Sequence, residues 1–388
     1  MKTNQKIPEG WSVKKLGEIC KNKGLYGANA PSVPYSPNLP LYIRITDIDD
    51  DGKYIFSNRV SVNISDYKNY LLEKGDIVFA RTGATTGKTY LYNENDGQFV
   101  FAGFLIKFSP NTNLINPYYL KLSTEMPFYK SWIKVMSVRS GQPGVNAEEY
   151  AKYPLLLPPL PEQEKIAEIL GAWDLAIEKV TALIAAKRLR KKGLMQKLLT
   201  AKIRLPGFTD EWQKVKLGEI ASIVKGEQLG RLEMTESGIY PVINGGILKS
   251  GFTDSYNREK NTITISEGGN SCGFVAFVKE RFWCGGHCYA LSNLKTDLHF
   301  LFQILKFSES NIMRLRVGSG LPNIQKSSLD NFLLHIPTDV SEQKAIADIL
   351  SKADEEIDLL VRKLDLLKSQ KKGLMQQLLT GKIRVKVA

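Results

Sequence analysis

The sequence has 388 residues, of which 43% are hydrophobic and 24% are charged, and its formal net charge is +13. This composition excludes a disordered chain, and the length is sufficient for two or three domains with hydrophobic cores. No apolar run approaches the roughly 18 residues of a membrane span, and residues 1–10 lack the apolar centre of a signal peptide. The charge favours a polyanionic partner, nucleic acid first and an acidic membrane surface second, although a generic basic protein would carry the same charge.

Residues 81–90, RTGATTGKTY, contain the residue types of a phosphate-binding loop. Such a loop needs four residues between its glycines and a helix behind the lysine. Here three residues separate Gly83 from Gly87, and the following TYLY is typical of a strand. The motif therefore predicts a glycine turn between two strands and no nucleotide site.

Residues 116–119, NPYY, resemble the Asn-Pro-Pro-Tyr motif of amino-methyltransferases but lack its second proline. No glycine-rich loop for S-adenosylmethionine follows a strand before them. Asn116 followed by proline is instead typical of a helix N-terminus, and it predicts a helix over residues 117–126. A glycine-rich loop follows at residues 139–146.

A long helix is predicted after the loop LPPLPEQ, because apolar residues keep a 3–4 spacing from Ile166 to Ile184. It would extend about 38 residues, or roughly 57 Å. Residues 187–204 hold eight Lys or Arg and no acid. This basic end is either a surface for phosphates or an acidic partner, or a solvated charged face.

The chain then repeats itself. Residues 342–384 match residues 162–204 without a gap, and 20 of the 43 positions are identical. The openings WSVKKLGEI (11–19) and WQKVKLGEI (212–220) also match, so the second copy begins near residue 205. The predicted fold is α+β, with two α+β domains alternating with two long helices that form an antiparallel coiled coil in a pseudo-twofold internal repeat.

The second copy tests the motifs of the first. Residues from Thr262 onward align with residues 76–92, so that Lys88 is aligned with Phe274. A lysine that grips phosphate would not be replaced by phenylalanine if both copies did the same chemistry. The shared feature is strand, glycine turn, strand.

Four cysteines fit a reducing compartment, and none of them needs a disulfide partner. The cluster CGGHC (284–288) lacks a second pair of ligands at zinc-like spacing. Cys284, His287 and Cys288 align with Phe101, Phe104 and Leu105. We therefore predict that these are positions in an apolar strand, and we predict no metal site.

The repeated LPPLPEQEKIAEIL…KKGLMQKLLTAKIRLPGF and SEQKAIADIL…KKGLMQQLLTGKIRV, with W…KLGEI opening each half, resemble the specificity subunit of type I restriction–modification systems. The resemblance covers the whole chain. It implies two target recognition domains, residues 1–157 and 205–338, each of which reads one half of a bipartite site on double-stranded DNA in the major groove. It also implies two helical spacers, residues 158–204 and 339–388, which set the spacing and dock two methyltransferase subunits.

The same resemblance places the chemistry on other subunits. The methyltransferase subunits would carry S-adenosylmethionine and methylate N6 of adenine. Restriction/translocase subunits would supply ATP hydrolysis with Mg. This chain would hold no catalytic residue and no cofactor, and it would act in a prokaryotic cytoplasm.

Base readout needs donors and acceptors on exposed loops, with Arg or Lys for guanine and Asn or Gln for adenine. In the first domain we expect DNA contacts at Arg81, Thr82, Thr85, Lys88, Arg139, Ser140, Gln142 and Asn146. In the second domain we expect them at Lys225, Gln228, Arg231, Asn244, Asn270, Ser271, Ser319, Asn323 and Gln325.

The two KKGLMQ tracts place apolar residues on similar surfaces, which suggests two copies of one partner. The expected contacts are Leu194, Met195, Leu198, Leu374, Met375 and Leu378. The rival interpretation is a coiled-coil scaffold that does not bind DNA. It explains the helices, but not two diverged domains carried on matched repeats in a basic chain.

Overall fold

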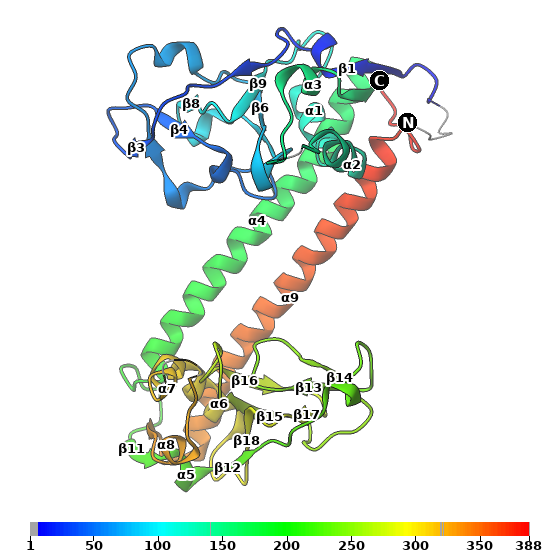
Figure 1. The fold of residues 1–388 in the computed structure, drawn as a ribbon. Coiled ribbons are helices and arrows are strands. Elements are labelled where there is room, and N and C mark those ends of the chain that lie inside the picture. Colours follow the sequence, from blue (N-terminus) through cyan, green and yellow to red (C-terminus); the bar gives the residue numbers. More distant parts are fainter. Residues whose placement is uncertain (1–6, 140, 319, 321, 388) are drawn as a thin grey trace. The chain divides into compact units, whose positions relative to one another are not determined.

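The computed structural model describes residues 7–139, 141–318, 320 and 322–387 (Figure 1). Its contacts divide the chain into two compact units. Unit 1 comprises residues 1–179 and 364–388, and unit 2 comprises residues 180–363. Each unit therefore combines one globular domain, here called the first or second domain, with part of each long helix. This division differs from a cut at the helix boundaries, because both long helices are shared.

Among the residues that the structure describes, the first domain has short strands, three short α-helices and several 3₁₀ turns. Its strands are β1 (Ser12–Lys15), β2 (Leu25–Tyr26), β3 (Val33–Pro34), β4 (Leu41–Ile43), β5 (Val60–Ser61), β6 (Ile77–Ala80), β7 (Thr89–Leu91), β8 (Phe99–Phe101), β9 (Leu105–Phe108) and β10 (Pro154–Leu157). Its helices are α1 (Pro117–Ser123), α2 (Pro127–Met136) and α3 (Ala147–Ala151). The strands form two sheets, in the orders β2-β9-β6-β7 and β3-β5-β4-β8, while β1 pairs with β10.

Helix α1 begins where the sequence predicted. The side chain of Asn116 accepts hydrogen bonds from the backbone N–H groups of Tyr118 (2.9 Å) and Tyr119 (3.0 Å). These bonds satisfy two donors that a helix start leaves open. The helix ends at Ser123, three residues before the predicted end at 126. The NPYY sequence is thus a helix cap.

The second domain repeats this plan with different side chains. Its strands are β11 (Gln213–Lys216), β12 (Ser222–Lys225), β13 (Tyr240–Ile243), β14 (Gly251–Thr253), β15 (Thr262–Ser266), β16 (Val275–Val278), β17 (Trp283–Cys284), β18 (Cys288–Ser292) and β19 (Leu333–Ile336). Its helices are α5 (Leu217–Ile220), α6 (Leu298–Phe307), α7 (Glu309–Met313) and α8 (Lys326–Asp330). The sheet orders are β12-β18-β15-β16, β14-β13-β17 and β11-β19.

The predicted pattern of strand, glycine turn and strand is confirmed in both domains. Strands β6 and β7 pair antiparallel, as do β15 and β16. The glycines of the two turns have positive φ values, namely Gly83 (70°), Gly87 (91°), Gly269 (75°) and Gly273 (89°). This backbone region carries little cost only for glycine, which explains why both turns keep the same two glycines.

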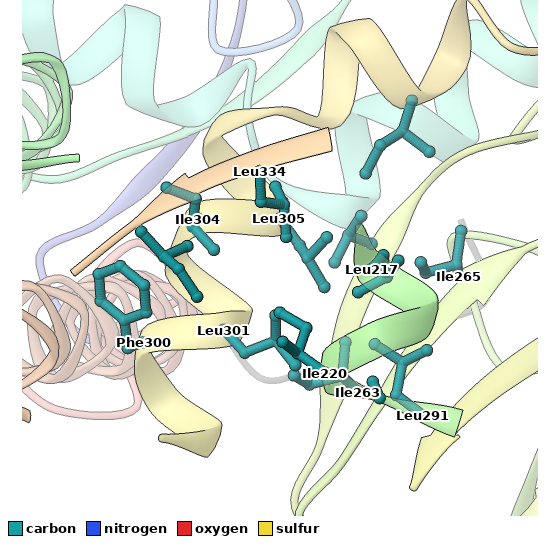
Figure 2. Packing of buried hydrophobic residues seen from close by; sticks show 14 of the residues in the cluster. Leu217, Ile220, Ile263, Ile265, Leu291, Phe300, Leu301, Ile304, Leu305 and Leu334 are labelled. Atoms are coloured by element: carbon teal, nitrogen blue, oxygen red, sulfur yellow. The ribbon is translucent and has the colours of Figure 1, made fainter. Parts of the chain in front are cut away.

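The core of unit 2 shows how the repeated elements pack (Figure 2). Phe300, Leu301, Ile304 and Leu305 share one face of α6 and are almost fully buried. They pack in one cluster with apolar side chains of α5, β15, β18 and β19, which include Leu217, Ile220, Ile263, Ile265, Leu291 and Leu334. The 3–4 spacing on α6 places its apolar residues on one face. Strand β15 is buried on both faces, because Thr264 and Ser266 are also no more than 3% exposed.

The long helices are α4 (Leu160–Leu198) and α9 (Val340–Leu378), with 39 residues each. They pack antiparallel, and ion pairs join α4 to α9 in each unit. In unit 1, Asp174 pairs with Lys371 (2.7 Å). In unit 2, Lys191 pairs with Asp354 (2.6 Å), and Lys187 pairs with Glu356 (2.5 Å). Within the described residues, no helix is long and apolar enough to cross a membrane.

A buried glutamate at the start of each long helix joins the two repeats. Glu162 accepts from Trp11 Nε1 (3.0 Å) and pairs with Arg384 (2.6 Å), and only 3% of its surface is exposed. Its counterpart Glu342 makes the same contacts in unit 2, with Trp212 Nε1 (3.3 Å) and Arg204 (2.7 Å). In each case the arginine comes from the other repeat.

The predicted partner surface on the KKGLMQ tracts requires a correction. Leu198, Met375 and Leu378 are no more than 6% exposed, because they pack into the domain cores of their own chain. Leu194, Met195 and Leu374 are partly buried against the same cores. Leu198, Met375 and Leu378 therefore close the two units and are not free to dock a partner. Docking at the partly exposed Leu194, Met195 and Leu374 stays a prediction.

Candidate nucleic-acid interface

The first domain joins two of its loops into one surface. Gly83 N, in the turn after β6, donates to Pro143 O in the loop before α3 (3.0 Å). Val145 N in that loop donates back to Arg81 O (2.9 Å). These backbone bonds hold together the two segments in which the sequence predicted DNA contacts.

The second domain uses the same backbone bonds. Gly269 N donates to Pro322 O (3.0 Å), and Ile324 N donates to Glu267 O (2.8 Å). The turn after β15 and the loop before α8 therefore form the counterpart surface. The two domains share one hydrogen-bonded frame and differ in the side chains that it carries.

A third segment, which was predicted to lie inside a strand, completes each surface. Arg81 N donates to Phe104 O (3.0 Å), and Glu267 N donates to His287 O (2.9 Å). Phe104 lies between β8 and β9, and His287 lies between β17 and β18, so each occupies a turn. Phe104 is 59% exposed, and the side chain of His287 is 63% exposed. The predicted strand position was wrong for both residues.

The neighbouring cysteines do occupy apolar strand positions, as predicted. Cys284 ends β17 and Cys288 begins β18, and both are buried. The hydrogen bond that the Cys284 thiol donates to Cys288, together with burial, raises the pKa of the Cys284 thiol. Among the residues that the structure describes, no group of three or more His, Cys, Asp or Glu side chains is placed to hold a metal ion.

The cations predicted in the first domain all have partners within the chain. The guanidinium of Arg81 lies 4.9 Å from the centre of the Tyr26 ring. Arg139 pairs with both carboxylate oxygens of Glu149 (2.6 Å each). Lys88 pairs with Asp50 (2.7 Å), which lowers the pKa of that carboxyl. Exposed pairs of this kind are weak in water, so a phosphate or base can replace the acid.

The neutral side chains of the first domain fall into two groups. Asn146 caps α3 by accepting from Glu149 N (2.9 Å), and Thr85 Oγ1 donates to Thr82 O (3.3 Å). These contacts serve the fold. Gln142 is exposed, and its side chain has no hydrogen-bond partner among the described residues. Ser140 lies outside the residues that the structure describes.

In the second domain, three of the predicted residues hold the frame. Lys225 pairs with Glu267 (2.6 Å). Asn244 accepts from His287 N (3.1 Å), and Ser271 Oγ donates to Gly245 O (2.6 Å). These side chains position the turns around them.

Four other predicted side chains of the second domain are exposed and have no partner in the described part of the chain. They are Gln228, Asn270, Asn323 and Gln325. Each offers a carboxamide with both a donor and an acceptor. Arg231 begins a 3₁₀ turn, and its side chain is not described. Ser319 lies outside the described residues.

The two surfaces have opposite electrostatic character at one matched position. Arg81 follows β6, where Glu267 follows β15. The Glu267 carboxylate also accepts from the hydroxyl of Tyr289 (3.1 Å), whose pKa is raised to about 12, mainly by burial. The first domain thus has a guanidinium at this position, and the second has a mostly buried carboxylate that Lys225 and Tyr289 engage.

The family model described as the type I restriction modification DNA specificity domain matches residues 8–187 and 209–369. The chain belongs to this family. The two domains described above are therefore its DNA recognition domains, and the alternative of a scaffold without DNA is not favoured.

Similar proteins span nearly the whole chain. The type I restriction enzyme MjaVIII specificity subunit of Methanocaldococcus jannaschii is 24% identical, covering 98% of this chain and 95% of the relative. The putative MjaX specificity subunit of the same organism is 29% identical with the same coverage. A crystal structure of a type I S subunit from M. genitalium aligns over 97% of this chain and 98% of that chain, with a TM-score of 0.72 at 18% identity. At this identity the structural likeness concerns the fold.

Proposed function

We propose that each recognition domain reads one half of a bipartite target on double-stranded DNA through its three joined segments. The observation that carries the proposal is the shared frame. Gly83 and Pro143 in one domain, and Gly269 and Pro322 in the other, make the same backbone bond, while the exposed side chains differ. A scaffold would need no such divergence, whereas two half-sites of different sequence require it.

The long helices would set the distance between the half-sites. Each has 39 residues, and an α-helix rises about 1.5 Å per residue, which gives about 58 Å. One turn of DNA measures about 34–36 Å. The length of such a helix is thus between one and two turns of DNA.

Two methyltransferase subunits would dock on the helical repeats, and restriction/translocase subunits would join them. Five cations near the end of α4 are exposed and have no ion-pair partner in the described part of the chain, namely Arg188, Arg190, Lys192, Lys197 and Lys202. Three others are paired with acids of α9 within unit 2, namely Lys187, Lys191 and Arg204. The five exposed cations suit phosphates or an acidic partner surface.

The chemistry would reside on these partners. The methyltransferase subunits would hold S-adenosylmethionine and methylate N6 of adenine, and the restriction/translocase subunits would use ATP with Mg. This chain would supply recognition without a catalytic residue of its own. We place the assembly in the prokaryotic cytoplasm, where its DNA substrate lies.

The test is co-expression with the cognate methyltransferase, followed by single-molecule sequencing of the host DNA for N6-methyladenine. One bipartite motif with a fixed gap, which disappears when this gene is deleted, is the expected result. A methylation pattern that is unchanged by the deletion would contradict the proposal.

A further inference from the structure

Phe104 and His287 occupy the same place in the two frames. The carbonyl of each accepts from the residue that follows the central strand, Arg81 N in one domain and Glu267 N in the other. The backbone of each is thereby bonded to the loop pair that forms the proposed interface. Both are more than half exposed, at 59% and 63%.

The turn that carries Phe104 is held firmly on both sides. Gly103 N donates to Ala28 O (2.8 Å), and Leu105 N donates to Ala102 O (2.8 Å). A Cβ on Gly27 would lie 2.3 Å from the Ala102 oxygen, so only glycine permits this close approach. The exposed ring therefore projects from a rigid base, which lowers the entropy lost on binding.

The turn that carries His287 is also held by hydrogen bonds. His287 N donates to the Asn244 side chain (3.1 Å), and Gly285 N donates to Ile243 O (2.8 Å). A Cβ on Gly226 would lie 2.3 Å from the Gly285 oxygen. A backbone position that both domains share, with a different exposed side chain in each, is the pattern expected of a residue that determines specificity.

The chemistry of the two rings differs in a way that bases can distinguish. A phenylalanine ring has no donor or acceptor, and the apolar feature of the major groove is the 5-methyl group of thymine. An imidazole can donate to the acceptors of a purine edge, such as N7. The adjoining Arg81 side chain, stacked on Tyr26, gives the Phe104 site a positive charge for the DNA backbone or a guanine.

We propose that Phe104 contacts the 5-methyl group of a thymine in the first half-site and that His287 contacts a purine at the matching position of the second. This inference rests on the proposed function, because it needs the two domains to bind separate half-sites. It adds a specificity-determining residue from a third segment in each domain.

The main test uses the target motif obtained from methylation sequencing. Binding of the complex with its methyltransferase is measured on duplexes in which single thymines of the first half-site are replaced by deoxyuridine. The wild-type complex should lose about fourfold in affinity at one position, the value of one buried methyl-sized group. The Phe104→Ala complex should bind the thymine and deoxyuridine duplexes equally.

Phe56→Ala is the matched control, because Phe56 is also an exposed phenylalanine of the first domain, at 52%. It should keep the wild-type sensitivity to deoxyuridine. Phe104→Leu keeps an apolar side chain and should retain part of the thymine preference, which guards against a loss caused by misfolding. Melting temperatures of all three variants should stay within about 2 °C of the wild type, since an exposed side chain contributes little to stability.

The exchange variant tests the second domain. His287→Phe should move the methylation motif toward thymine at one position of the second half-site, with the first half-site unchanged. The inference is overturned if no thymine of the first half-site is sensitive in the wild type, or if Phe104→Ala keeps the sensitivity. It is also overturned if the Phe104→Ala chain no longer binds the methyltransferase subunit but keeps its thymine preference, since Phe104 would then contact a protein. Absence of any bipartite methylation in the wild type would instead contradict the proposed function.

Discussion

Two regions of the molecule differ in what the internal repeat keeps. One is the set of contacts around Glu162 and Glu342, here called the seam, and the other is the pair of recognition surfaces. At the seam, Glu162 and Glu342 keep the same tryptophan and arginine partners. At the recognition surfaces, the backbone bonds are kept while Arg81 is exchanged for Glu267. A contact that crosses between repeats constrains both copies at once, whereas an exposed side chain on a shared frame is free to differ.

Breaking the seam should produce the largest effect. Glu162→Ala removes the acceptor of Trp11 Nε1 and leaves that buried donor without a partner, while Arg384 loses its ion pair. We expect the melting temperature to fall by about 5 °C, as measured by calorimetry. Glu164→Ala, at an exposed neighbouring position, should change it by less than about 1 °C. Equal melting temperatures for the two variants would show that the seam does not stabilise unit 1.

Removing a structural residue of the recognition surface should have a smaller effect. Asn146 caps α3 and forms a capping box with Glu149. Asn146→Ala should lower the free energy of unfolding by about 1 kcal/mol, measured by urea denaturation. Asn146→Asp keeps an acceptor and should restore most of the loss. If both variants lose the same stability, the cap is not the cause.

The turn that follows each long helix has a residue with positive φ, which is alanine in the first copy and glycine in the second. Ala201 has a φ of 55°, where its counterpart Gly381 has a φ of 69°. Ala201→Gly should raise the free energy of unfolding by about 0.5 kcal/mol, because relief of strain exceeds the added entropy of the unfolded chain. Urea denaturation measures the change, and a lower stability would contradict it.

Changing an exposed polar residue of the surface should leave stability almost unchanged and alter recognition instead. Gln142 has no side-chain partner in the described residues, so Gln142→Ala should change the free energy of unfolding by less than about 0.5 kcal/mol. We expect methylation sequencing to show a relaxed base preference in the first half-site alone. A relaxed second half-site would contradict the assignment of one half-site to each domain.

The repeat made much of the fold predictable. The 3–4 spacing of α4 and α9, the glycine turns and the Asn116 cap are local patterns, and each was confirmed. The partners of the cations were not predictable. Tyr26 is distant in sequence from its partner Arg81, and Glu149 meets its partner Arg139 only because the loop between them folds back. The turn at Phe104 was hidden by a nearly continuous apolar run, in which Gly103 was the single signal. The burial of Leu198, Met375 and Leu378 was not predictable from the KKGLMQ tracts, because these residues pack on a domain of their own chain.

The composition of the two units has a consequence for synthesis on the ribosome. Unit 2 is one continuous stretch, residues 180–363, so all of its core residues have been made before the last 25 residues emerge, which are 364–388. Unit 1 needs those last residues, because Met375, Leu378 and Leu379 belong to its core. Although its domain is translated first, unit 1 is the last to close, and a ribosome that stops before residue 375 releases a chain whose first domain still exposes an apolar face.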